Sequence, residues 1–296
     1  MIGALFAISS ALAFAFNNIF IRRAVLKVPD AGIGTLISVP MAVPLYFAAL
    51  AFTGQTGSVV GFSWRGYIWL SLAGIFHFVV GRTLFYHCVQ LVGANIAGIL
   101  RRTSILISVV FGITLLHEPL SWKLAIGVLF IIIGISLPGL SSQVFRDSDG
   151  RLVRIPARAL MLGFGCGLAW GVSPIFIKLG LSGSQAPVAG AFISFSAATA
   201  TLSLSLLNPK RRTAVTHLSP GAAALFFVAG LFSCSANLTR FIALGLAPAS
   251  VVAPLVSITP VFLLIFSFLF NRRLEIFSRP VIVGTVTVVI GTILLI

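Results

Sequence analysis

The sequence predicts an all-α membrane protein with ten transmembrane helices, arranged as two inverted repeats of five helices each. Two observations lead to this prediction: ten apolar stretches fill most of the 296 residues, and the second half of the chain repeats features of the first. Hydrophobic residues make up 58% of the chain and charged residues only 8%, whereas about a quarter of the residues in soluble domains are charged. A lipid bilayer is therefore the expected surrounding.

Each apolar stretch is long enough to cross a bilayer. A spanning helix needs about 20 residues, because backbone N–H and C=O groups must pair within the segment where water is absent. No basic leading region or cleavage site marks the first stretch, so we expect a retained helix rather than a signal peptide. The longest polar break, 141–158, divides the chain into predicted repeats at 1–140 and 159–296. The expected spans are 2–21, 32–52, 66–88, 93–116, 123–140, 159–179, 187–207, 221–244, 248–270 and 279–296.

Basic residues between the spans predict the orientation in the membrane. The odd-numbered connections hold Arg22, Arg23, Lys27, Arg146, Arg151, Arg154, Arg158, Lys210, Arg211, Arg212, Arg272, Arg273 and Arg279. By the positive-inside rule these connections face the cytoplasm. The net charge of +15 is then a consequence of topology, and we expect no nucleic-acid partner.

Short matches at nearly constant spacing relate the two halves. Residues 19–22 (IFIR) recur as 175–178 (IFIK), and 73–76 (AGIF) recur as 229–232 (AGLF), both offset by 156. Two glycines of the fifth span, Gly127 and Gly134, recur as Gly284 and Gly291, offset by 157. Because each repeat has an odd number of spans, the second enters the bilayer from the opposite side. Inverted repeats of this kind are typical of transporters that alternate access to a site at the repeat interface.

Three arginines fall inside the expected spans: Arg82, Arg101 and Arg102. Arg82 and Arg101 lie on either side of the short connection 89–92, on the order of 10 Å inside one membrane face at 1.5 Å per residue. They are therefore placed to meet. Arginine is costly at this depth, which favours an aqueous cavity, helix carbonyls or an anionic group of a substrate as its partner. The alternative is that the side chains snorkel to the headgroups.

Other polar and aromatic residues align with these arginines through helical spacing or the repeat offset. Ser104 shares a helix face with Arg101, and Tyr86 shares one with Arg82, although such polar stripes also serve as packing seams. Under the offset of 156, Trp170 aligns with Phe14 in an aromatic wall. The predicted substrate-binding residues are Arg82, Arg101, Ser104, Tyr86, Asn17, Asn18, Trp170 and Asn237.

Three prolines predict helix breaks that either act as gates or are packing kinks. Pro174, at the repeat equivalent of Asn18, removes a backbone hydrogen bond in span six, and Pro254 and Pro260 bend span nine. The cysteines are too few and scattered to predict a disulfide or a metal site, and no cofactor is expected.

The run at the end of span four resembles a known family signature. Residues 115–121 (LLHEPLS), followed by Trp122, resemble the L-G-E-x-L-[ST] signature of the EamA family in the drug/metabolite transporter superfamily, departing at His117. Residues 240–250, from RFIAL to APAS, resemble its A-L-x-x-x-x-A-S/A hairpin. In the second half, residues 271–275 (NRRLE) are expected to have lost the acidic residue from the equivalent place. The resemblance implies ten helices around a central cavity.

These observations predict a secondary-active or facilitative transporter of small organic metabolites in a bacterial inner membrane. The five carboxylates all fall near span ends or in connections, which disfavours cation/proton exchange. The arginines favour an amino acid, an organic acid or a phosphorylated metabolite. One alternative is a translocase for an anionic lipid or lipid-linked sugar, and another is an intramembrane enzyme, for which the catalytic motifs are missing. The oligomeric state is left open, with a monomer as one option.

Overall fold

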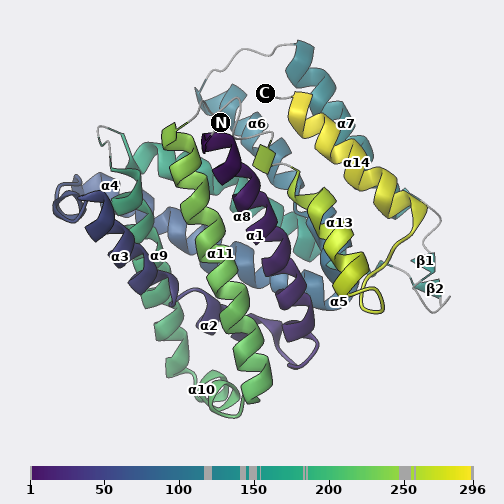
Figure 1. The fold of residues 1–296 in the computed structure, drawn as a ribbon, viewed down its shortest axis with the longest axis horizontal. Coiled ribbons are helices and arrows are strands. Elements are labelled where there is room, and N and C mark those ends of the chain that lie inside the picture. Colours follow the sequence, from purple (N-terminus) through teal and green to yellow (C-terminus); the bar gives the residue numbers. More distant parts are fainter. Residues whose placement is uncertain are drawn as a thin grey trace.

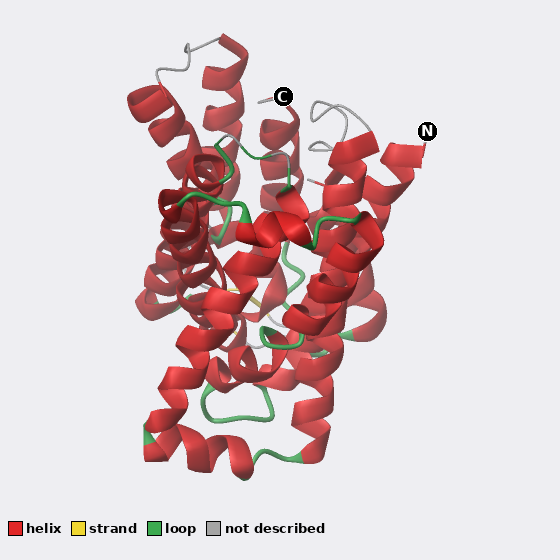
Figure 2. Cartoon of the chain, turned by 90° about the vertical axis from the view of Figure 1, so that its left-hand side faces the viewer, coloured by secondary structure: helices red, strands yellow, loops and turns green. Residues whose placement is uncertain are grey.

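The computed structural model describes residues 2–116, 122–140, 145–146, 152–153, 155–182, 184, 186–246, 255–256 and 258–294. Within these residues the fold is a bundle of helices, accompanied by one hairpin in which β1 (Phe145–Arg146) pairs antiparallel with β2 (Leu152–Val153) (Figure 1). Both termini lie at one end of the bundle (Figure 2). The end of α1 (Ile2–Val25) and the basic helix α10 (Pro209–Thr216) lie at the other end.

The helices follow the expected apolar stretches. In the first half they are α1, α2 (Thr35–Ser38), α3 (Ala42–Thr53), α4 (Trp64–Gly74), α5 (Arg82–Leu100), α6 (Thr103–Leu116) and α7 (Trp122–Leu140), with the short helices η1 (Ala31–Gly34) and η2 (Gly57–Val60) and the π-helix η3 (Ile75–Gly81). The second half contains α8 (Ala157–Gly180), α9 (Pro187–Leu204), η4 (Ser205–Leu207), α10, α11 (Pro220–Leu246), α13 (Thr259–Phe270) and α14 (Arg279–Leu294). Within the described residues, six segments are long and apolar enough to cross a membrane, and three shorter apolar helices accompany them.

One of those six segments, Trp64–Ile107, contains a reversal of chain direction. Gly93, inside α5, has φ 81° and ψ 167°, a backbone conformation that favours glycine. Before this break the chain runs antiparallel to α8, since Leu84 lies beside Gly165 and Cys88 contacts the Ala159 carbonyl. After it the chain runs parallel to α8, with Leu100 beside Gly163 and Ile107 beside Gly171. The expected hairpin of spans three and four therefore turns at a single glycine, and residues 89–92 belong to the helix.

Helices from the two halves pack against one another. The long helices α1 and α11 lie side by side, and the Ser10 hydroxyl donates to the Ala236 carbonyl across them at 2.7 Å. Helix α8 of the second half packs against α4, α5 and α6 of the first half. Large apolar side chains such as Phe52 and Leu207 remain on the outside of the bundle, as a lipid surrounding requires.

The last helices of the two halves, α7 and α14, form a separate antiparallel pair at one edge of the bundle (Figure 1). A Cβ atom added at Gly134 would lie 2.8 Å from the Gly284 carbonyl oxygen, and one added at Gly291 would lie 2.7 Å from the Gly127 carbonyl oxygen. The four repeated glycines therefore face one another, and their small size lets the two backbones approach closely.

The prolines differ in what they do to the helices. The second expected span is interrupted at Pro40, between α2 and α3, whereas α8 continues through Pro174 to Gly180. Pro260 lies in the first turn of α13, a position where its missing N–H costs nothing. Pro254 lies outside the described residues. A gating role for these prolines stays a prediction.

Candidate functional site

Arg82 is buried within the bundle and lies at the centre of the candidate site. It begins α5 directly after the π-helix η3, a type of distortion that is often found at functional sites. Its side chain donates from Nη2 to the Ser233 hydroxyl of α11 at 2.8 Å, and the residue is only 6% exposed. The other terminal nitrogen, Nη1, is buried without a hydrogen bond of good geometry to any described residue.

Aromatic residues surround this guanidinium. The Arg82 guanidinium lies 5.2 Å from the centre of the Phe78 ring, and Phe78 in turn stacks on Phe195 of α9. The Tyr86 hydroxyl, one turn after Arg82 on α5, lies beside the guanidinium and 3.0 Å from the Ser38 hydroxyl. Tyr46 of α3 stacks on Phe195, and its buried hydroxyl has no partner among the described residues. The residues around Arg82 therefore offer hydroxyl groups as well as aromatic rings.

Arg101 lies over a second aromatic group. Its guanidinium is 5.2 Å from the ring centre of Trp170 and 5.6 Å from that of Phe85. The Trp170 ring stacks on His77, and its Nε1 donates to the His77 carbonyl at 2.7 Å. Arg101 and Arg82 both lie within electrostatic range of His77. The two arginines therefore contact different rings, Phe78 for Arg82 and Trp170 and Phe85 for Arg101, and both lie within electrostatic range of His77. That they meet directly stays a prediction.

Arg240, which is not among the predicted substrate-binding residues, also lies near this site. Along α11, Ser233, Asn237 and Arg240 follow one another at spacings of four and three residues, so they share one helix face. The Asn237 amide donates to the Ser233 carbonyl at 2.8 Å. Arg240 is exposed and lies within electrostatic range of His77 and Tyr46. The same periodicity, read from Asn237, could have predicted it.

The described carboxylates do not neutralise these arginines. Asp30 lies 3.2 Å from His87, and Glu275 lies 3.6 Å from Arg22, both outside the group just described. The guanidinium groups of Arg82 and Arg101 therefore lie among rings and hydroxyls with no described carboxylate beside them, and the exposed Arg240 lies within electrostatic range of the same region. A region of this kind is suited to bind an anionic group together with an apolar or aromatic body.

Three predicted residues are not brought to this group by any described contact. The Asn18 amide donates to the Phe14 carbonyl within α1, and the side-chain oxygens of Asn17 and Asn18 are both buried without a partner among the described residues. The Ser104 backbone packs against Gly167 and Gly171 of α8. The roles of Asn17, Asn18 and Ser104 in substrate binding stay predictions.

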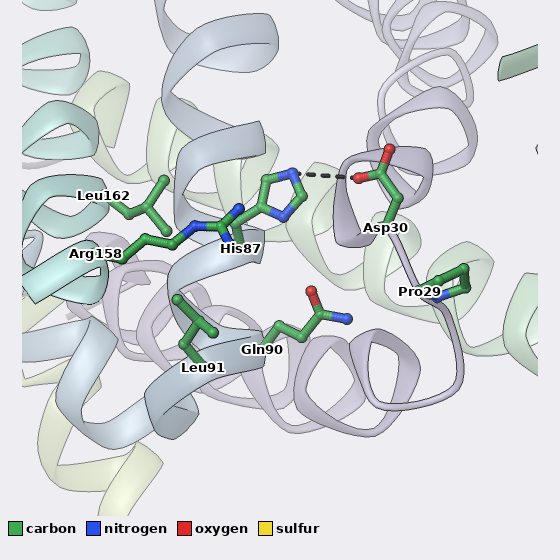
Figure 3. Close-up of a pocket in the computed structure, with 7 residues that line it drawn as sticks. All are labelled: Pro29, Asp30, His87, Gln90, Leu91, Arg158 and Leu162. Atoms are coloured by element: carbon green, nitrogen blue, oxygen red, sulfur yellow. Dashed lines mark ion pairs between the residues drawn. The ribbon is translucent and has the colours of Figure 1, made fainter. Parts of the chain in front are cut away.

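A pocket of about 510 Å³ is lined by residues other than the central arginines (Figure 3). It is lined by Pro29, Asp30, His87, Gln90, Leu91, Arg158 and Leu162. Its polar groups are largely engaged, since His87 pairs with Asp30 and the Gln90 amide donates to the Val25 and Val28 carbonyls. The lining contains both an acidic residue, Asp30, and a basic residue, Arg158, so the pocket offers no clear preference for a charged ligand.

The second half of the chain retains the acidic residue that it was expected to have lost. Glu275 lies 157 residues after Glu118, the same offset that relates Gly127 to Gly284. The expectation of a loss was therefore wrong by one position in the alignment. Burial raises the pKa of the Glu275 carboxyl, and the Arg22 charge together with the N–H groups of Asn95 and Ala94 opposes this shift. Glu118 itself lies outside the described residues.

The fold and the site define a multi-pass membrane protein with a buried cationic and aromatic centre. The family described as "EamA-like transporter family" matches residues 1–138 and 157–296. The chain therefore belongs to the EamA-like transporter family, whose members are membrane transporters of the drug/metabolite transporter superfamily. A solved structure described only as "Crystal structure of protein" has 15% identity and a TM-score of 0.56 over 99% of this chain and 95% of its own, which shows a shared fold. The comparison with curated proteins found no match.

Proposed function

We propose that this transporter exports or exchanges small organic metabolites that carry an anionic group, by secondary-active or facilitative alternating access. The observation that carries the proposal is the buried Arg82 guanidinium, which has one nitrogen free of good hydrogen bonds and no described carboxylate beside it. An arginine in this state is costly in a membrane protein unless a ligand supplies the missing charge. Candidate substrates are amino acids, organic acids and phosphorylated metabolites.

Helix packing supports two inverted repeats of five spans as the framework for alternating access. The antiparallel seam between α7 and α14 joins the fifth helix of each repeat through equivalent glycines. Likewise, the first helix of each repeat packs against the third of the other, α1 against α11 and α8 against α4 and α5. A two-fold axis in the membrane plane would relate these pairs, and it would pass near the arginine group between the repeats.

The charge distribution supports an orientation with the basic end in the cytoplasm of a bacterial inner membrane. The end of α1, with Arg22 and Arg23, and α10, with Lys210, lie at the end of the bundle opposite the termini. At 1.5 Å per residue, Arg240 lies about 10 Å along α11 from Ser233, toward the end of the bundle where the termini lie. Arg240 would then contact the substrate near the periplasmic entrance and Arg82 would contact it at the centre.

Uptake and exchange in proteoliposomes test this proposal. The panel contains amino acids, organic acids, sugar phosphates, cationic amines and a fluorescent anionic lipid, so that the lipid-translocase alternative is one of its arms. We expect transport of a small anionic metabolite that is lost in Arg82→Gln and kept in Arg65→Gln, because Arg65 is exposed on α4. Transport of cationic amines alone, or equal rates for both variants, would contradict the proposal.

A further inference from the structure

The loop between α13 and α14 is tied to the end of α1 by a dense group of hydrogen bonds. Arg22 donates from Nε and Nη2 to the Leu274 carbonyl at 2.9 and 2.6 Å. The same guanidinium donates from Nη1 to the Val89 carbonyl of α5 at 2.6 Å and to the Gln90 carbonyl at 3.1 Å. One arginine therefore connects three elements, two from the first half of the chain and one from the second.

Glu275, the next residue in this loop, binds the broken helix α5. Its Oε1 accepts the Ala94 N–H at 2.7 Å, and its Oε2 accepts the Asn95 N–H at 3.0 Å. The break at Gly93 leaves these N–H groups without a carbonyl partner in a preceding helical turn. The Glu275 carboxylate therefore caps the helical segment that begins after the break. The fit is close, since a Cβ atom at Gly93 would lie 2.5 Å from Oε2. The Glu275 side chain is 0% exposed and that of Arg22 is 12% exposed.

A second set of contacts joins the same elements beside this group. Arg23 donates from Nε to the Asn271 side chain at 2.7 Å and from Nη2 to the Phe270 carbonyl at 2.6 Å. The Asn271 amide donates back to the Ile19 carbonyl of α1 at 3.0 Å. We call Arg22, Arg23, Asn271, Glu275 and the Gly93 break the latch. Its members come from both halves of the chain, so any movement between the halves at this end must break it.

We propose that the latch is the closed gate on the basic face of the transporter, and that its release opens the arginine site to that face. The inference rests on the proposed alternating-access function. The latch joins the end of α1 to the loop after α13, and the end of α1 lies at the end of the bundle opposite the termini, as does the basic helix α10 (Figure 1). The hydrogen bonds across it are mutually dependent, because a Glu275 carboxylate withdrawn from Ala94 and Asn95 leaves Arg22 without its counter-charge. Such a group has two well-defined states, bound or released, as a gate requires.

The reactivity of Cys234 can report access to the central site. It follows Ser233 on α11, is 2% exposed and lies within electrostatic range of Arg82. In a background with Cys88→Ala and Cys166→Ala, it is the remaining thiol in the chain. A membrane-impermeant maleimide is added to inside-out or right-side-out vesicles, and the labelling rate is measured from each face.

We expect slow labelling from the basic face, and a rise of at least tenfold from that face in Glu275→Gln, with a fall from the opposite face. Asn271→Ala, which removes the second set of contacts and leaves Glu275 in place, should give a smaller change in the same direction. The matched control is Asp30→Asn, which removes the other described ion pair at this end without touching the latch. It should leave both rates unchanged.

Three outcomes would overturn the inference. Unchanged labelling in Glu275→Gln would show that the contacts hold no gate, and a rise from both faces would show that the latch only stabilises the fold. An equal effect in Asp30→Asn would show that any lost ion pair loosens this end. Labelling needs no substrate, so a failure of the transport panel leaves this test intact, and a failed latch leaves the anion panel to be judged separately.

Discussion

Replacing Arg82 by glutamine should lower transport while leaving the fold at least as stable as before. This combination separates a binding residue from a structural one. A structural arginine holds other groups in place, so its loss weakens the fold. A binding arginine is positioned for a substrate that is absent from the substrate-free protein. Removing it therefore removes an unfavourable contribution to the stability of the substrate-free protein.

The magnitudes follow from the contacts of Arg82. An arginine at the centre of a membrane helix costs about 2.5–3.5 kcal/mol on insertion scales. Its hydrogen bond to the Ser233 hydroxyl returns about 1.5–3 kcal/mol, and a glutamine amide can still reach that hydroxyl in part. The free energy of unfolding should therefore stay the same or rise by about 0–2 kcal/mol. A substrate anion would lose one charged hydrogen bond, about 1.5–3 kcal/mol, which corresponds to a half-saturation concentration roughly 10- to 100-fold higher.

Two measurements on the same purified variant check this reasoning. Concentration-dependent uptake in proteoliposomes gives the half-saturation constant, and thermal unfolding in detergent gives the change in Tm relative to the wild type. Arg65→Gln serves as the control in both assays. A Tm clearly below that of the wild type, or an unchanged half-saturation constant, would refute the assignment of Arg82 as a substrate-binding residue.

Three further substitutions test other parts of the structure. Ser233→Ala removes the hydrogen bond that orients Arg82, so the half-saturation constant should rise by a smaller factor than in Arg82→Gln, about 3- to 10-fold, in the same uptake assay. Gly134→Val places new atoms against the Gly284 carbonyl and the Val288 side chain and should cost about 1–3 kcal/mol, seen as a lower Tm, whereas Gly57→Ala, with open space around it, should not change the Tm. Gly93→Ala should lower the Tm, because alanine is strained at a φ of 81° and its Cβ atom would press against the Glu275 carboxylate. An unchanged Tm would mean that the break at Gly93 is not required.

Hydropathy was sufficient to predict the helices and the membrane, because these depend on composition along the chain, and the motifs at residues 115–121 and 240–250 predicted the family. The arginines were predicted to be central for a related reason: a guanidinium inside an apolar stretch stands out in any sequence. The repeat offset also predicted the α7 and α14 glycines as equivalent positions. It could not predict that they face each other, since that depends on which helices from the two halves become neighbours.

The latch and Arg240 depend on contacts between distant segments and were missed for that reason. Glu275 looked like an ordinary residue in a basic loop, and its partners lie about 180 residues earlier, at Ala94 and Asn95. Arg240 lies near the end of the expected span 221–244, where an arginine does not stand out as a binding residue. Only the packing of α11 against the helices around it brings its charge into range of His77 and Tyr46.

The glycine seam between α7 and α14 is symmetric. Gly134 meets Gly284, and Gly127 meets Gly291, so exchanging the two helices exchanges the two contacts. A surface that pairs with its own equivalent is self-complementary, as in a symmetric homodimer. A side chain larger than glycine at Gly134 or at Gly291 would therefore meet the backbone of the other helix in the same way, and the close approach of α7 and α14 depends on both positions.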